Sequence, residues 1–467
     1  MTQVCRKPVP PGRVINNPVF AWWDYPLFLV LTGLALSAVL YSAMYWFSSS
    51  LWRAHPILCS LITFVGAVII VNHFGRWFLL LLMKKPVPIA ARAGWNVGVV
   101  TTFVPGVESH AMLEKTLTAL VAMDYPHDTW VLDEGDTAEV KLLCQQLGAR
   151  HFSRKGQAHY QTERGDFQTR SKHGNYNAWL DAIGFAQYGI VASFDPDHVP
   201  DRTFLTEVLG YFDDPTVGYV QAPQVYGNQY ASLVARGAAE ETYAYNSSIQ
   251  MASYGMGYPI VVGCHNTHRV TALRDVGGFA PHDADDLLIT LFYRTSGWQG
   301  VYVPKILARG QTPETWRAYL TQQRRWARSV LDIKLNVAPR LDVDWPLASR
   351  VMSRLHGVNY IHRGLLIPLE IGLLGYLLIT GMATEFVTHE GMLRLGIVAV
   401  ALQLDEFYRQ RFYLDWRTEW GLHWRAGLLN LAKCPSLLAA LVDVLLNRRF
   451  AYETTPKTRA SSSTSSI

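Results

Sequence analysis

Two carboxylates separated by one residue follow a short apolar run near the middle of the chain. Asp195 and Asp197 come directly after the run 190–194. Carboxylates at this spacing can share a hard divalent cation, and Mg²⁺ or Mn²⁺ held in this way keeps water ligands and binds substrate phosphates. The spacing alone is weak evidence, because it occurs twice more in the chain. A solvated turn stabilised by Asp and Pro is the alternative explanation.

Other polar residues have types that suit catalysis or phosphate binding. Asp286 precedes the apolar run 287–292, where a carboxylate can simply complement the dipole of a helix. Gln322, Arg325 and Trp326 lie in a stretch with helical periodicity. An arginine there can bind a phosphate and a tryptophan can stack on a sugar ring, although such residues are more often packed surface side chains.

Alternating strands and helices must position these side chains. Strand patterns cover 97–104, 129–132 and 190–194, and helical periodicity covers 112–123, 140–147 and 177–186. Such alternation predicts an α/β domain over 94–345, with a mostly parallel sheet covered by helices. Parallel sheets bind ligands at the carboxyl ends of their strands. Asp133, Asp195 and Asp197 follow two of these strands, so we expect them on the ligand side.

The composition indicates that part of the chain lies in a membrane. Hydrophobic residues make up 49% and charged residues 17% of the 467 residues, with a net charge of +5, whereas soluble domains carry about 25% charged residues. Four apolar runs are predicted to span the bilayer, at 27–47, 54–75, 364–384 and 391–404. The domain organisation is therefore 1–93 with two spans, 94–345 as the polar domain, and 346–404 with two further spans.

Charge asymmetry predicts the orientation of these spans. The flanks of the first pair hold Arg6, Lys7, Arg13, Arg76, Lys84, Lys85 and Arg92, whereas the connection holds only Arg53. The positive-inside rule places both termini and the polar domain in the cytoplasm. Residues 424–446 are apolar but interrupted by Arg425, Lys433 and Asp443 and broken by Pro435, so an interfacial helix is favoured over a fifth span.

Two classes of protein are disfavoured by residue distribution. The five cysteines form no C-x-x-C pair, so neither a disulfide framework nor a zinc ribbon is expected, and a reducing compartment fits the polar domain. Lysine and arginine concentrate at the membrane flanks rather than on one soluble face, which argues against a nucleic-acid partner.

Taken in order, several stretches resemble the membrane-embedded family 2 glycosyltransferases that make polysaccharides, such as cellulose, chitin-oligosaccharide and hyaluronan synthases. These stretches are 123–135, 172–177, 194–200, 277–279 and 311–326. The resemblance runs from about residue 94 to 457 and is greatest to bacterial cellulose synthases. It implies a GT-A-like, Rossmann-like cytoplasmic domain between transmembrane segments of a multi-pass protein in the inner (plasma) membrane.

The resemblance also implies an inverting transfer of a hexose, glucose from UDP-glucose, to a growing or lipid-linked glycan. Asp133 and Asp195 correspond to nucleotide contacts, Lys172 to a donor-site lysine, and Asp197 with Asp195 to the ligands of Mg²⁺ or Mn²⁺. Asp286 corresponds to the general base, in a triplet Ala284-Asp285-Asp286 where the family has Thr-Glu-Asp.

The acceptor and gating elements complete the implied site. Gln322, Arg325 and Trp326 correspond to the diphosphate clamp and the floor of the acceptor site. Tyr452, Thr455 and Lys457 resemble a gating loop that closes over nucleotide, with a plain cytosolic tail as the alternative. Cys264 falls near the end of the acceptor-proximal loop, although a small buried hydrophobic residue is the favoured interpretation. Residues 405–459 would hold the interfacial helix and this loop, and 460–467 a disordered tail.

The chain departs from the family pattern in ways that leave alternatives open. Gly106-Val107-Glu108 replaces the usual Tyr-Asn-Glu, so another donor, UDP-GlcNAc or GDP-mannose, used non-processively, is the second interpretation. A catalytically dead scaffold is the third, because Ala284 replaces Thr. The chain ends soon after Lys457, without the further spans of cellulose synthases, so we expect additional membrane subunits to complete a channel.

Overall fold

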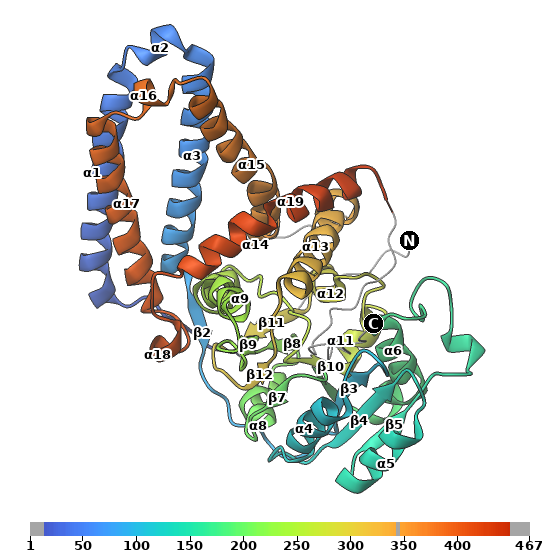
Figure 1. Cartoon of the computed structure of the whole chain (residues 1–467). Helices are drawn as coiled ribbons and strands as arrows, with labels where there is room; N and C mark the ends of the chain where they lie inside the picture. The colour runs from blue at the N-terminus through green and yellow to red at the C-terminus, as the bar shows by residue number, and fades with distance from the viewer. Residues whose placement is uncertain (1–13, 342–345, 449–467) are drawn as a thin grey trace, which may run out of the picture.

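A seven-stranded sheet forms the centre of the polar domain in the computed structural model, which describes residues 14–341 and 346–448 (Figure 1). The strand order is β11-β8-β10-β6-β3-β4-β5. Their bounds are β3 Val97–Phe103, β4 Asp128–Asp133, β5 Arg150–Phe152, β6 Ile190–Phe194, β8 Val217–Gln221, β10 Asn266–Arg269 and β11 Gln299–Tyr302. β10 pairs antiparallel with both neighbours, and the other pairs are parallel. The prediction of a mostly parallel sheet is confirmed.

Helices cover both faces of this sheet, which explains why every residue of β3 is buried. On one face, Val99 packs in a core with residues of α4 (His110–Val121) and α8 (Phe204–Val208). On the other, Val100 packs in a core with residues of α6 (Lys172–Trp179), α11 (Val270–Asp275) and α12 (Asp285–Thr295). α5 (Ala138–Leu147) lies beside α4. The helices of the structure therefore lie where the periodicity of the sequence predicts them.

One predicted helix begins earlier than its apolar periodicity indicates. The expected helix over 177–186 starts at Lys172 as α6, because Ser171 caps it by accepting a hydrogen bond from the Gly174 amide at 3.1 Å. A π-helical turn, Leu180–Gly184, follows it. The shift brings Lys172 to the first turn of a helix that opens at the carboxyl edge of the sheet.

Two helical hairpins rise from one end of the sheet domain (Figure 1). The first joins α1 (Tyr25–Ser48) to α3 (Pro56–Phe78) through α2 (Leu51–Ala54), and the second joins α15 (Val358–Ile379) to α17 (His389–Gln410) through α16 (Ala383–Phe386). α1 packs along α17. Both connections lie at the end far from the sheet, where Tyr45 and Thr388 share a hydrogen bond of 2.8 Å (Figure 1).

Four helical segments among the described residues are long and apolar enough to cross a membrane. They are Trp22–Ser48, Pro56–Leu82, Val358–Ile379 and Trp424–Leu445. The first three overlap predicted spans, although the third begins and ends earlier than the expected 364–384. The predicted fourth run, 391–404, lies in α17, which is not one of the four and carries charges at both ends. It nevertheless packs against α1.

The helix α19 (Trp424–Leu445) runs across the base of the hairpins, between them and the sheet domain (Figure 1). It continues through Pro435, so the expectation that this proline breaks the segment is wrong. α19 packs on α9 (Leu233–Ala244), α13 (Trp316–Asp332) and α15. Its buried Lys433 donates to both carboxylate oxygens of Glu241 at 2.8 Å and to Gln323 at 3.0 Å. Packing on these helices stabilises α19 and so offsets the loss of the one backbone hydrogen bond that proline cannot make.

Candidate functional site

Lys172 and Asp195 form an ion pair at the carboxyl edge of the sheet. Asp195 follows β6, and Lys172 Nζ lies 2.5 Å from Asp195 Oδ1 and also donates to the carbonyl of Gly263. Burial alone would lower the pKa of the Lys172 ammonium, but Asp195, with smaller effects of Tyr176 and Asp285, holds it well above its usual range. Lys172 therefore stays protonated, and its charge is paired with that of Asp195 at the acidic strand end.

The predicted base, Asp286, lines the same pocket as Lys172. Lys172, Gly263, Asp285 and Asp286 all line it. Burial, reinforced by the neighbouring carboxylate of Asp285, raises the pKa of Asp286 to about 7. A group that titrates near neutral pH can take a proton and release it during turnover. The arrangement therefore places a carboxyl group that titrates near neutral pH beside a lysine.

The residues around Asp197 fit a divalent cation. Asp195, Asp197 and His198 each offer a ligand atom, and these atoms lie within 4.8 Å of one another. Asp197 and His198 are buried, and the amide of Gln311 donates to Asp197 Oδ2 at 3.3 Å. Two carboxylates suit Mg²⁺ or Mn²⁺, and an imidazole nitrogen in the same set favours a transition metal over Mg²⁺.

Sequence reasoning missed two histidines of this region. His198 directly follows the D-x-D spacing, so the motif itself was the signal that could have identified it. His265 has a left-handed backbone with φ of 57°, and its Nδ1 bonds to the carbonyl of Pro223 at 2.8 Å. Its buried Nε2 has no partner in the described part of the chain. The fully buried Cys264 lies beside both histidines.

Asp133 stabilises the turn that follows β4 and does not line the pocket. Its carboxylate accepts hydrogen bonds from the amides of Gly135 at 2.8 Å and Thr137 at 2.7 Å and lies 3.3 Å from His151 Nε2. The side chain is fully buried. Burial alone would raise its pKa, but these hydrogen bonds lower it, so Asp133 stays ionised and holds the turn before α5. Its contact with a nucleotide stays a prediction.

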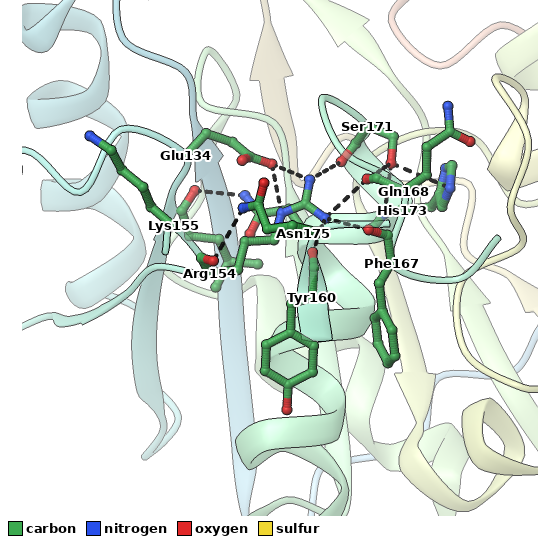
Figure 2. Close-up of polar contacts among 12 residues, drawn as sticks. Glu134, Arg154, Lys155, Tyr160, Phe167, Gln168, Ser171, His173 and Asn175 are labelled. Carbon is green, nitrogen blue, oxygen red and sulfur yellow. Dashed lines mark hydrogen bonds and ion pairs between the residues drawn. The ribbon is translucent and has the colours of Figure 1, made fainter. Parts of the chain in front are cut away.

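Arg154 joins the strand end to the loop that precedes Lys172 (Figure 2). Its fully buried guanidinium donates to Glu134 Oε1 and to the backbone carbonyls of Tyr160, Phe167, Gln168 and Ser171. Figure 2 shows these acceptors converging on the guanidinium from the loop and from the turn after β4. Arg154 therefore fixes where α6, and with it Lys172, begins.

The motif that begins at Lys172 is explained by close contacts. A Cβ atom at Gly174 would lie 2.2 Å from the carbonyl oxygen of Gln168 and 2.7 Å from Arg154 Nη1, so only glycine fits there. Asn177 accepts a hydrogen bond from the Phe279 amide at 2.7 Å and donates to the Phe279 carbonyl at 2.9 Å. This pairing connects the motif at 172–177 with the one at 277–279.

The helix α13 carries the predicted acceptor residues and is joined to the segment that precedes the base. Arg328 lies 3.4 Å from Asp283, and His282 lies 3.0 Å from Asp332. Gln322 is buried, whereas Arg325 and Trp326 are partly exposed. The structure thus brings α13 beside the base segment. Tyr452, Thr455 and Lys457 lie outside the described residues, and their gating role stays a prediction.

Comparison with known proteins agrees with this geometry. Residues 98–329 match the family described as "Glycosyltransferase like family 2". This part of the chain therefore matches a family 2 glycosyltransferase domain, and the chain resembles the catalytic subunit of cellulose synthase.

Two relatives and one solved structure give the extent of the similarity. The chain is 27% identical over 292 residues to a "Cellulose synthase catalytic subunit [UDP-forming]" of Xanthomonas axonopodis, covering 60% of this chain and 37% of the relative. It is 26% identical over 263 residues to "Cellulose synthase 1 catalytic subunit [UDP-forming]" of Komagataeibacter xylinus, covering 54% of this chain and 33% of the relative. The match thus spans about a third of each relative's length.

The fold has a counterpart that covers more of the chain. A mannosyltransferase from Pyrobaculum calidifontis, solved in complex with GDP-Man and Mn²⁺, aligns with a TM-score of 0.56 and 18% identity. The alignment covers 82% of this chain and 99% of that one. It confirms the predicted GT-A-like architecture.

Proposed function

We propose that this protein transfers a hexose, with inversion, from a nucleotide sugar to a growing or lipid-linked glycan at the cytoplasmic face of a membrane. The observation that carries the proposal is the pocket that Lys172 and Asp286 line together, with Lys172 paired to Asp195, which lies beside Asp197 and His198. UDP-glucose is the proposed donor, because the cellulose synthase relatives are named as UDP-forming.

The chemistry of the transfer requires one proton to leave and one diphosphate charge to be stabilised. Asp286, with its pKa near 7, would accept the proton of the attacking hydroxyl. Lys172 and Arg325 would hold the departing diphosphate through charge-assisted hydrogen bonds. A divalent cation, when bound by Asp195, Asp197 and His198, would supply further positive charge for the same diphosphate.

The acceptor would approach from the side of α13 and the hairpins. Trp326 would place its indole face against a sugar ring, and Gln322 would position the same helix. Asp133 would keep the turn after β4 in place for the nucleotide base. Closure by Tyr452, Thr455 and Lys457 over the bound nucleotide completes the proposal.

The proposed topology has both hairpins in the inner membrane and the sheet domain in the cytoplasm. It is supported by the shared position of α2 and α16 at the end far from the sheet (Figure 1). α19, with Lys433 bound to Glu241, is better suited to the interface than to the bilayer core. The partners are the nucleotide sugar, the glycan or glycolipid acceptor, the lipid bilayer and additional membrane subunits.

The test is UDP release by membranes that carry Asp286→Asn. We expect turnover to fall by about 10² to 10⁴, with donor binding nearly unchanged, because the variant keeps the shape but cannot accept a proton. Asp275→Asn is the matched control, since Asp275 is exposed at the end of α11. Near-normal turnover of Asp286→Asn would refute the assignment. Metal-dependent nucleotide binding by the unaltered protein without any turnover would identify a scaffold.

A further inference from the structure

Three arginines from three hairpin helices meet at the end of the hairpins that faces the sheet domain. Arg76 lies near the end of α3, Arg363 near the start of α15 and Arg409 near the end of α17. Arg76 is within electrostatic range of both other guanidinium groups. In Figure 1 the lower ends of α3 and α17 lie above α18 (Trp416–Glu419), and the start of α15 lies at α19. Like charges gathered in one place are stabilised by an anion nearby.

The acidic residues of this region neutralise only part of the charge. Glu406 pairs with Arg409, and its Oε1 lies 3.9 Å from Arg76 Nη2. Asp405 is engaged instead with His73, at 2.9 Å. No ion pair reaches Arg363 from any residue in the described ranges. Glu406 is therefore shared by Arg76 and Arg409.

Several donors of this cluster are buried and unused. Arg409 is 5% exposed, yet its Nε and Nη1 have no hydrogen-bond partner within 14–341 and 346–448. Arg76 Nε is also buried without a partner, as is Nε2 of His362, which lies in electrostatic range of Arg76 and Arg363. Buried donors that carry charge are normally bonded. An anion with several acceptor oxygens, such as a phosphate, would satisfy them together.

The apolar surface above the cluster indicates how such a phosphate arrives. Exposed aliphatic and aromatic side chains cover the helices beyond the arginines, among them Ile69 and Phe64 on α3 and Leu374 on α15. α3 and α15 lie close together near α16 and splay apart toward α19 (Figure 1). A lipid whose chains cover this surface would place its headgroup at the arginines.

We propose that Arg76, Arg363 and Arg409 form a binding site for the phosphate group of an anionic membrane lipid. The inference rests on the proposed function only in placing α3, α15 and α17 in a bilayer. Tyr360 lies within electrostatic range of both Arg363 and Asp286. A lipid bound at the arginines therefore has its headgroup on the membrane side of the catalytic pocket.

The test is lipid retention by the full chain purified in a neutral detergent, measured by native mass spectrometry during titration. The probes are phosphatidylglycerol, phosphatidylcholine of the same chain length, and inorganic phosphate. We expect tight retention of phosphatidylglycerol over phosphatidylcholine and no competition by millimolar inorganic phosphate. Arg363→Gln and Arg409→Gln should each weaken retention of phosphatidylglycerol by about tenfold or more, because each removes a charge-assisted contact.

Two features of the design keep the outcomes distinct. Arg363→Gln breaks no ion pair of the described structure, so it tests the site without the folding risk of Arg409→Gln, and Arg417→Gln on the exposed α18 is the matched control. Equal retention of both lipids, an equal loss in Arg417→Gln, or displacement by inorganic phosphate would each overturn the proposal. The assay needs no sugar transfer, so failure of the proposed function, seen as absent UDP release, is a separate result.

Discussion

Gly310 lies so close to the imidazole of His198 that a Cβ atom at residue 310 would come within 1.7 Å of its Cδ2 and Nε2 atoms. The glycine therefore leaves the space that His198 needs beside Asp197. His198 is buried next to the carboxylates of Asp195 and Asp197, and Gly310, at the end of β12 (Ala308–Gly310), has no side chain that would displace it. The imidazole is therefore held in one orientation. That orientation is the basis for expecting it to act with the carboxylates.

The first prediction concerns the metal. Mn²⁺ should bind the purified protein more tightly than Mg²⁺, because imidazole suits transition metals. His198→Ala should therefore lower the affinity for Mn²⁺ by about tenfold or more and change the affinity for Mg²⁺ little. Electron paramagnetic resonance of free Mn²⁺ measures this without turnover. His159→Ala, in an exposed part of the loop before α6, is the control. An unchanged Mn²⁺ affinity would remove His198 from the ligand set.

The second prediction concerns pH. Asp286 must be deprotonated to act as a base, and its pKa is raised to about 7 by burial and by Asp285. kcat/KM should therefore rise about tenfold per pH unit below pH 7 and level off above it. An ordinary aspartate would already be fully ionised at pH 6. UDP release between pH 5 and 9, with donor binding measured at the same values, checks this. A flat profile above pH 5 would contradict the assignment of the base.

The strands and their acidic ends could be predicted from sequence because they depend on local patterns. The run 190–194 is a buried strand in the prediction and in the structure, because a continuous apolar run is typical of a strand that is covered by helices on both faces. Asp195 follows this strand, as predicted. α6 began earlier than predicted because its start depends on a cap, Ser171, and not on apolar periodicity. The continuous α19 depends likewise on packing that Pro435 alone does not reveal.

Much of the site could not be predicted, because it is built from backbone groups and distant partners. Arg154 bonds to carbonyl groups, which every residue has, so no side-chain pattern marks it. The partner of Asn177 is 102 residues away, at Phe279. The unusual backbone of His265 follows from the geometry of the loop before β10. Such features need the tertiary structure.

The third prediction follows from the Arg154 network. Arg154→Met should destabilise the protein by about 3 to 5 kcal/mol, because it leaves Glu134 and several carbonyls without their donor. Arg154→Lys should keep the positive charge but not the conformation of the loop before α6, because one ammonium group cannot reach all the acceptors. Thermal unfolding and donor affinity are the measurements. Arg164→Met, exposed in the same loop, should have neither effect. If Arg154→Lys kept full donor affinity, the loop would not depend on the guanidinium.

The fourth prediction concerns topology. A cysteine in place of Ser50, at the connection before α2, should react with an impermeant maleimide added outside intact cells, whereas Ser463→Cys in the tail should react only after permeabilisation. The reason is that two complete hairpins return the chain to the cytoplasm. The native cysteines of the described ranges are buried, which limits background labelling. Labelling of Ser463→Cys from outside would instead make 424–446 a fifth span.

The fifth prediction is that Trp326 and Arg325 on α13 separate kinetically. The flat indole of Trp326 suits the apolar face of a pyranose and adds little to diphosphate binding, whereas the guanidinium of Arg325 binds phosphate oxygens in pairs. Trp326→Ala should therefore shorten or abolish the product while UDP affinity barely changes. Arg325→Ala should weaken UDP binding by about 1.5 to 3 kcal/mol.

Calorimetry with UDP and the purified protein measures the donor side of this separation, and product length measures the acceptor side. Arg317→Ala is the control, because it removes a charge from an exposed position at the start of the same helix. The contact of Arg328 with Asp283 holds α13 beside the segment that precedes Asp286, and the prediction requires Arg325 and Trp326 to reach the pocket from there. If Trp326→Ala lost UDP affinity as severely as Arg325→Ala, the two roles would be inseparable, and α13 would belong to the donor site alone.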